Sequence, residues 1–181
     1  MLDDYGFEIY EENEFPLAYL ITFRTFGTWL HGDARSSINR SNAGVKRTVV
    51  LDRNVPLEEK MRDEMTQAPV MLDISQRRAV NDAIRELCAG RNYYLHAQSI
   101  RTNHVHAAVA AAAKPERVAD AMKAFATKRL RELGLVGTTE RVWSRGRSRR
   151  YLWKPRDVEA AVNYVLYCQD DTPFDIEDWV R

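Results

Sequence analysis

The stretch Arg101-Thr-Asn-His104-Val-His106-Ala-Ala-Val-Ala110 carries two histidines on either side of one apolar residue. In a β-strand, residues two positions apart point to the same face of the sheet. His104 and His106 are therefore expected to face one side together, while Val105 faces the other. Two neutral imidazoles on one face supply two ligands for a divalent metal ion. The stretch predicts a strand that carries part of a metal site.

The residues around the histidines predict a hairpin. Tyr93 to Ser99 has the composition of a strand, and the alanine- and valine-rich run from His104 to Ala113 has that of a second one. Between them, Arg101-Thr102-Asn103 has the composition of a turn, since asparagine tolerates a positive φ. The histidine pair then opens the second arm of the hairpin.

Length and composition limit the class of protein. A chain of 181 residues with 45% hydrophobic residues can form one domain with a sizeable core. The net charge of +1 gives no overall basic character, so the distribution of charge matters more. The apolar runs are too short to cross a bilayer, and we expect no membrane partner. Cys88 and Cys168 lack the spacing of a disulfide frame or a zinc site, which favours reduced thiols and a cytoplasmic location.

The remaining elements follow from hydrophobic periodicity. The prediction places a buried strand at 17–27, an amphipathic helix at 75–89, a long helix from 115 to 133, a strand around 151–153 and a helix at 157–169. With the hairpin, the first six regular elements have the order β-α-β-β-α-β. That order predicts an α+β, ferredoxin-like fold, an antiparallel sheet with two helices on one face, followed by an added C-terminal helix.

Three segments lie outside this pattern. Residues 34–73 have no lasting period and are interpreted as an insertion that contains a short polar helix beginning at Pro56. Residues 1–15 and 170–181 are acidic and are interpreted as tails. The core of the single domain is therefore expected at 17–169.

Basic and aromatic residues alternate between 141 and 156, without an acidic residue among them. Basic groups neutralise phosphates and aromatic faces stack on bases, so this composition favours single-stranded nucleic acid. The alternative is a solvated charged hairpin whose tryptophans pack in the core. The candidate DNA-binding residues are Trp143, Arg145, Arg147, Arg149, Arg150 and Trp153, with Lys128 on the preceding helix.

Two short motifs resemble those of a known superfamily. Thr102-Asn103-His104-Val105-His106 resembles the strand motif, and Val162-Asn163-Tyr164-Val165 the helix motif, of the HUH endonucleases with one catalytic tyrosine. Within that superfamily the chain is most similar to the IS200/IS605-type transposases and the REP-associated tyrosine transposases. The likeness covers roughly Leu17 to Gln169.

The resemblance implies a function. It implies a metal-dependent endonuclease and strand transferase, or transposase, that acts on single-stranded DNA containing a hairpin. His104 and His106 would bind Mg²⁺ or Mn²⁺, and the Tyr164 hydroxyl would attack the phosphorus to give a 5′-phosphotyrosine intermediate. Tyr167 is the alternative nucleophile. The resemblance also implies a homodimer.

The third metal ligand departs from the family pattern. Family members often carry Gln or Asn four residues after the tyrosine, about one helical turn away. Here that position is Cys168, and the nearest amide is Gln169. Either Gln169 binds the metal from a slightly rotated helix, or the third ligand lies elsewhere, with His31 and Asp33 as distant candidates, or the site is degraded.

Two other functions remain open. A non-catalytic, single-stranded nucleic-acid-binding module can use the same sheet, but such a platform needs aromatic residues where His104 to Ala113 has alanines. A different His-x-His phosphoesterase would need a second histidine-rich strand, and the chain has only two other histidines, His31 and His96.

Overall fold

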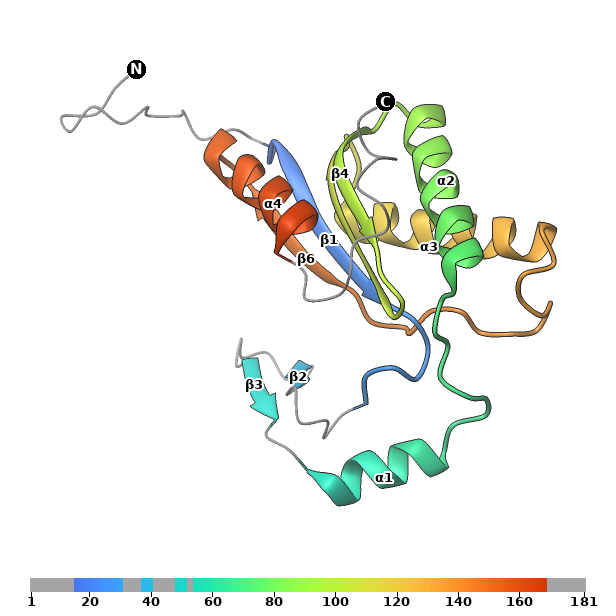
Figure 1. Cartoon of the computed structure of the whole chain (residues 1–181). Helices are drawn as coiled ribbons and strands as arrows, with labels where there is room; N and C mark the ends of the chain where they lie inside the picture. Colours follow the sequence, from blue (N-terminus) through green and yellow to red (C-terminus); the bar gives the residue numbers. More distant parts are fainter. Residues whose placement is uncertain (1–14, 31–36, 41–47, 52–53, 169–181) are drawn as a thin grey trace.

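The computed structural model describes residues 15–30, 37–40, 48–51 and 54–168. The order of the core elements β1, α2, β4, β5, α3 and β6 confirms the predicted order (Figure 1). In chain order the elements are β1 (Ala18–Arg24), β2 (Ser37–Arg40), β3 (Thr48–Leu51), α1 (Val55–Asp63), α2 (Ile74–Gly90), β4 (Tyr94–Ile100), β5 (His104–Ala110), α3 (Pro115–Glu132), β6 (Ser148–Leu152) and α4 (Pro155–Tyr167).

The main sheet has the strand order β4-β5-β1-β6, and all neighbouring strands are antiparallel. This is the predicted ferredoxin-like arrangement, with the histidine strand β5 in the interior of the sheet. The turn Arg101–Asn103 joins β4 and β5, and the Arg101 N–H donates to the His104 carbonyl at 2.8 Å. The short connection makes the hairpin antiparallel.

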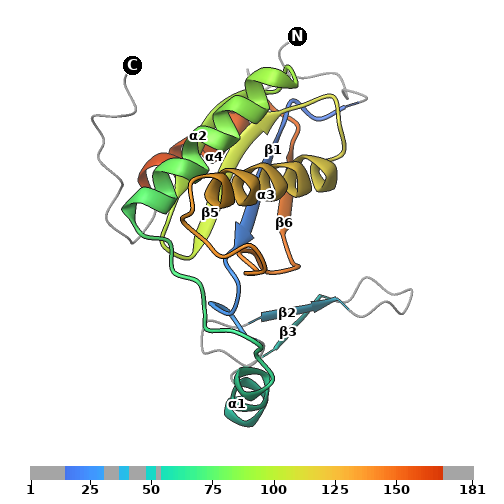
Figure 2. The ribbon, with the colours of Figure 1, turned by 90° about the vertical axis from the view of Figure 1, so that its right-hand side faces the viewer.

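The two faces of the sheet are covered by different helices. In Figure 2, α2 and α3 lie in front of the sheet and α4 lies behind it. The alternation of side chains sorts the residues of β5 between these faces. Val105, Ala107 and Val109 lie in the main core beside α2 and α3, whereas Ala108 packs against Val165 of α4. The histidines share the parity of Ala108 and belong to the α4 face.

Small residues let α4 lie close to the sheet. Val165 packs against Ala97 and Ala108, and Ala161 packs against Ala18 and Leu152. The alanine-rich strand, which lacks the aromatic residues of a base-stacking platform, therefore provides a packing surface for α4. Because α4 covers them, Ala108 has no exposed surface.

Two helix starts differ from the predicted ones. Asp73, not Ser75, caps α2: its carboxylate accepts from the Gln76 N–H at 2.7 Å, and the Gln76 side chain accepts from the Asp73 N–H at 2.9 Å. Helix α4 begins at Pro155, two residues before the expected Asp157. Proline is favoured there because its φ is already helical.

The region expected to be an insertion contains regular structure. Strands β2 and β3 pair with each other in a separate two-stranded sheet, and α1 follows them. Asn54 caps α1, and Pro56 lies in its first turn. In Figures 1 and 2 these elements lie together at one end of the molecule, apart from the main sheet.

None of the helices in the described part of the chain has the length and apolar character that a membrane span requires.

Candidate functional site

The two histidines of β5 lie side by side on the face covered by α4. Their ring centroids are 4.7 Å apart, with an interplanar angle of 78°. His106 is buried, with 6% of its surface exposed, whereas His104 is half-buried. The structure thus brings together the two side chains that the His-x-His spacing selects.

A hydrogen bond orients each imidazole. Nδ1 of His104 donates to the side-chain oxygen of Asn103 at 2.6 Å, and Nδ1 of His106 lies 2.7 Å from the Thr22 hydroxyl. Thr22 is the cross-strand partner of His106 in β1. A neutral imidazole that donates from Nδ1 carries its lone pair on Nε2. Metal-binding histidines commonly have such an oxygen partner on the other nitrogen, because it fixes the tautomer and the ring orientation.

The asparagine is itself held in place. The Asn103 carbonyl accepts from the Thr25 N–H at 2.9 Å and from the Thr25 hydroxyl at 3.1 Å. Thr25 is completely buried. The turn before β5 is therefore fixed to the end of β1, and this explains why Asn103 keeps its side chain at His104. The sequence motif placed Asn103 in the turn but did not reveal its contact with His104.

Tyr164 lies over the histidine pair. Its ring is 5.4 Å from that of His106, centroid to centroid, with an interplanar angle of 81°. Tyr164 is 41% exposed. It is next to Val165, which anchors α4, so docking of the helix carries the phenol over the sheet. Tyr167 is 73% exposed, and Tyr164 is the tyrosine that contacts His106.

A groove of about 320 Å³ opens beside the tyrosine. Thr22 and Tyr164 line it and connect it to the histidine pair, and Arg150 of β6 contributes a positive charge. The other lining residues are Leu20, Ser148, Ala160 and Ala161. The groove therefore combines an exposed arginine with a hydroxyl-bearing aromatic ring that contacts His106.

The alternation of β6 divides the basic stretch between two faces. Arg150 faces the groove, whereas Arg147 and Arg149 face α3. There Arg147 pairs with Asp120 at 2.8 Å, and Arg149 pairs with Glu116 at 2.7 Å. Arg145 is exposed in the segment before β6, and Lys128 pairs with Glu132 on α3 at 3.6 Å. Of the predicted DNA-binding side chains, Arg150 is the one that lines the groove.

The two tryptophans of the basic stretch have different environments. Trp143 is 7% exposed, packs edge-on against Phe23 at 5.0 Å and lies in the main core, as in the alternative interpretation of this segment. Trp153 is 44% exposed and stacks on Tyr151, with ring centroids 6.3 Å apart and planes 15° apart. Trp153 is therefore the tryptophan with an accessible ring.

The residues present fit part of a divalent-metal site. His104 and His106 are adjacent, and their Nδ1 atoms are bound to oxygen atoms. Among the residues that the structure describes, no group of three or more His, Cys, Asp or Glu side chains is placed to hold a metal ion. The suggested third ligands Gln169, His31 and Asp33 lie outside the described ranges. The two imidazoles thus account for two ligands.

The Thr22 contact leads to a prediction. Thr22→Val removes the hydroxyl while keeping the shape of the side chain, so the His106 ring loses its oxygen partner. We expect Mn²⁺ affinity, measured by calorimetric titration, to fall by about 10- to 100-fold. Thr22→Ser keeps a hydroxyl and should stay within a few-fold of the wild type. Equal affinities for the valine and serine variants would contradict a role for this hydrogen bond.

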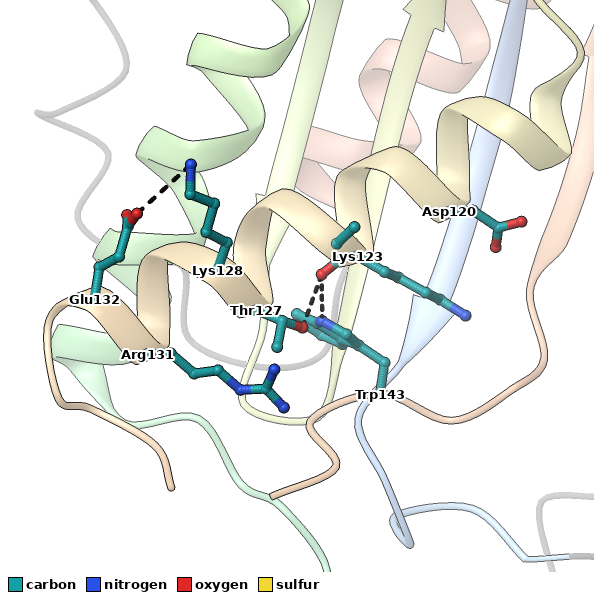
Figure 3. A pocket seen from close by; sticks show the side chains of 8 residues that line it. Asp120, Lys123, Thr127, Lys128, Arg131, Glu132 and Trp143 are labelled. Carbon is teal, nitrogen blue, oxygen red and sulfur yellow. Dashed lines mark hydrogen bonds and ion pairs between the residues drawn. The ribbon is translucent and has the colours of Figure 1, made fainter. Parts of the chain in front are cut away.

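A second cavity, of about 600 Å³, lies on the α3 side of the molecule (Figure 3). Lys123 and Trp143 line it, and the Trp143 indole donates to the Lys123 carbonyl at 3.1 Å. The Lys123 ammonium donates to the carbonyls of Ser144 at 2.9 Å and Gly146 at 2.8 Å. Lys123 thereby ties the segment before β6 to α3.

Burial, with a smaller contribution from the nearby Arg147, lowers the pKa of Lys123 from 10.5 to about 8. Between about pH 8 and pH 10.5, Lys123 is protonated more fully in the unfolded chain than in the folded one. The free energy of unfolding should therefore rise with pH in this range. Lys123→Met removes this titration. In urea unfolding, the stability of the wild type relative to Lys123→Met should increase from pH 7.5 to pH 9.5, by less than about 1.4 kcal/mol per pH unit because of solvent screening. Parallel pH dependences would contradict this assignment.

Comparison with known proteins identifies no family. No family model matches the chain, and no curated protein matches it. Among solved structures, one similar chain is a REP-associated tyrosine transposase bound to a REP hairpin. The similarity has a TM-score of 0.46 and 9% sequence identity, and it covers 87% of this chain and 70% of the other. At this level of similarity the comparison assigns no function to the chain.

Proposed function

We propose that the protein is a metal-dependent, single-stranded DNA endonuclease and strand transferase with Tyr164 as its nucleophile. The observation that carries the proposal is the contact between the Tyr164 and His106 rings, 5.4 Å apart at the edge of a groove that holds Arg150. The motifs around His104 and Tyr164 resemble those of the HUH transposases and support the same assignment.

The chemistry is a transesterification. The Tyr164 hydroxyl oxygen attacks the phosphorus and forms a phosphotyrosine bond, while the bond from phosphorus to the 3′-oxygen breaks. The phenol loses one proton and the leaving 3′-oxygen gains one, so a free 3′-hydroxyl results. Because one phosphodiester replaces another, a second 3′-hydroxyl can reverse the step and join strands. A bound Mg²⁺ or Mn²⁺ ion on His104 and His106 would supply positive charge to the phosphate oxygens.

The groove favours a single strand. Its volume of about 320 Å³ is at the lower end of the range for small-molecule pockets. We expect one DNA backbone to enter this groove, with Arg150 contacting a phosphate near Tyr164. A duplex would need room for a second strand. The hairpin expected from the resemblance would then lie outside this groove.

A single chain supplies both parts of the proposed site. Tyr164 contacts His106 of its own chain, so the chemistry does not require exchange of α4 between subunits. The homodimer implied by the resemblance stays a prediction.

An adduct assay tests the proposed function. The protein is mixed with labelled single-stranded oligonucleotides from both flanks of its gene, with Mn²⁺ or with EDTA, and resolved on a denaturing gel. We expect an SDS-stable protein–DNA adduct with Mn²⁺ and none with EDTA. Tight binding without an adduct on any of these oligonucleotides would overturn the proposal.

One observation favours a second candidate, a non-catalytic module that binds single-stranded nucleic acid. The rings of Tyr151, on the edge strand β6, and of Trp153, just after it, are stacked and exposed, close in sequence to Arg149. Exposed aromatic rings stack on bases without sequence preference. Under this alternative, Trp153→Ala weakens DNA binding. The wild type binds DNA with the same affinity in Mn²⁺ and in EDTA and forms no adduct in either.

A further inference from the structure

An arginine lies on the same face as the histidine pair. Arg24 ends β1 and is the cross-strand partner of His104. It is two residues from Thr22, which contacts His106, so alternation places both side chains on the α4 face. Side chains of cross-strand partners start about 5 Å apart. Arg24 belongs to no motif that marks it as a site residue in the sequence.

Trp29 holds this arginine. The Arg24 guanidinium carbon is 3.2 Å from the centroid of the Trp29 ring, and both side chains are half-buried. Stacking uses the flat face of the guanidinium, whereas its five N–H donors lie in the plane. A guanidinium fixed in this way loses less conformational freedom when it binds an oxyanion.

The turn that brings Trp29 back to Arg24 is tightly constrained. The Thr28 hydroxyl donates to the Thr25 carbonyl at 3.1 Å. Gly27 has a φ of 72°, and a Cβ atom there would lie 2.7 Å from the Met65 side chain and 3.1 Å from the Pro69 Cα. Glycine meets both requirements, the positive φ and the close packing. The Arg24–Trp29 stack is thus built into the end of β1.

The neighbourhood of Arg24 suits an anion. An arginine is permanently charged, and a divalent cation on the histidine pair, as proposed above, would add to the positive charge on this face. Arginine binds phosphate oxygens through two parallel N–H donors. In the reaction proposed above, the anion is the DNA backbone.

We propose that Arg24, held by Trp29, is a phosphate-binding residue of this site and contacts a backbone phosphate of the DNA strand that reaches Tyr164. The inference rests on the proposed function for its ligand, single-stranded DNA. The DNA strand would then contact two arginines, Arg150 in the groove and Arg24 on β1 at the His104 end of the site.

The test measures binding rather than cleavage. Fluorescein-labelled single-stranded oligonucleotides from the flanks of the gene are titrated with Tyr164→Phe protein in Mn²⁺, at several salt concentrations. Adding Arg24→Gln should weaken binding about tenfold at low salt and reduce the slope of log K against log salt by about 0.7, the loss of one phosphate contact. Arg85→Gln, at an exposed position on α2, is the matched control and should change neither quantity.

A scan with single methylphosphonates locates the contact. In the Tyr164→Phe protein, which keeps Arg24, one methylphosphonate position should weaken DNA binding. In the protein that also carries Arg24→Gln, the same methylphosphonate should cause no further loss of affinity. If every neutralised phosphate affects both proteins equally, or if Arg24→Gln keeps the full salt slope, the inference is overturned. Circular dichroism and thermal unfolding of Arg24→Lys and Arg24→Gln separate a lost contact from a lost fold.

The inference and the proposed function can fail separately. If the wild type forms no adduct but one phosphate depends on Arg24, the protein is a binding module and the phosphate contact stands. If the adduct forms but no methylphosphonate position has an effect that depends on Arg24, the proposed endonuclease function is supported and the proposed Arg24–phosphate contact is refuted.

Discussion

Tyr164→Phe will abolish the covalent DNA adduct, with a loss of at least about a thousandfold in the rate of adduct formation. The substitution removes the oxygen that attacks the phosphorus, and no other group then forms the covalent bond. The ring remains, so its packing against His106 is kept. Affinity for single-stranded DNA should therefore stay within about twofold of the wild type. Denaturing gels measure the adduct, and fluorescence anisotropy measures the binding.

Tyr167→Phe is the matched control. Tyr167 is on the same helix, one turn closer to its end, and is 73% exposed. We expect this variant to form the adduct at the rate of the wild type. An adduct that is lost in Tyr167→Phe and kept in Tyr164→Phe would identify Tyr167 as the nucleophile. The helix would then have to turn or shift to bring Tyr167 to the histidines.

His106→Ala will reduce adduct formation by about a hundredfold or more while single-stranded DNA still binds. The imidazole supplies one proposed metal ligand and also contacts Tyr164 and Thr22. Its loss removes a ligand and leaves space beneath the phenol, and both effects reduce the rate. The rate is measured at saturating DNA across a range of Mn²⁺ concentrations. A shift of the Mn²⁺ midpoint assigns the effect to metal binding.

His96→Ala controls for the general loss of a histidine from the sheet. His96 lies on β4 and packs against Tyr94, with ring centroids 4.7 Å apart, and burial lowers its pKa. We expect this variant to keep the wild-type rate and Mn²⁺ midpoint. A His106→Ala protein that forms the adduct normally in EDTA would show that the histidine pair does not act through a metal ion.

Much of the fold follows from local patterns. The amphipathic helix predicted at 75–89 is present as α2. Its apolar residues at three-and-four spacing, Val80, Ala83, Ile84, Leu87 and Cys88, are all buried. The spacing of the helices and strands predicted the order of the core elements along the chain, which the structure confirms. The ends of elements were less accurate, as the Asp73 cap shows, because a cap depends on one side chain reaching one N–H group. Pairing of β2 with β3 was not predicted, since those segments are only four residues long.

The basic stretch shows what a composition leaves open. Its residues suggested one DNA-binding surface, yet Arg150 lines the groove while Arg147 and Arg149 form ion pairs with α3. The alternation of β6 could have revealed this division, because period two assigns neighbouring arginines to opposite faces. The burial of Trp143 could not be read from the same pattern. The burial of Trp143 depends on its packing against Phe23, which lies 120 positions earlier in the chain.

The sequence by itself determined that His104 and His106 face one way, because the geometry of an extended chain repeats every two residues whatever surrounds it. It also determined that Tyr164 lies on a helix and beside a buried residue. Only the tertiary structure decided that the phenol meets His106, that Thr22 and Asn103 orient the imidazoles, and that Arg24 lies opposite His104. Apart from the contact between the neighbouring residues Asn103 and His104, these contacts join segments far apart in the chain. Their distances are set by how closely α4 packs on Ala97 and Ala108 and by the register of β1 on β5, and neither is encoded in local spacing.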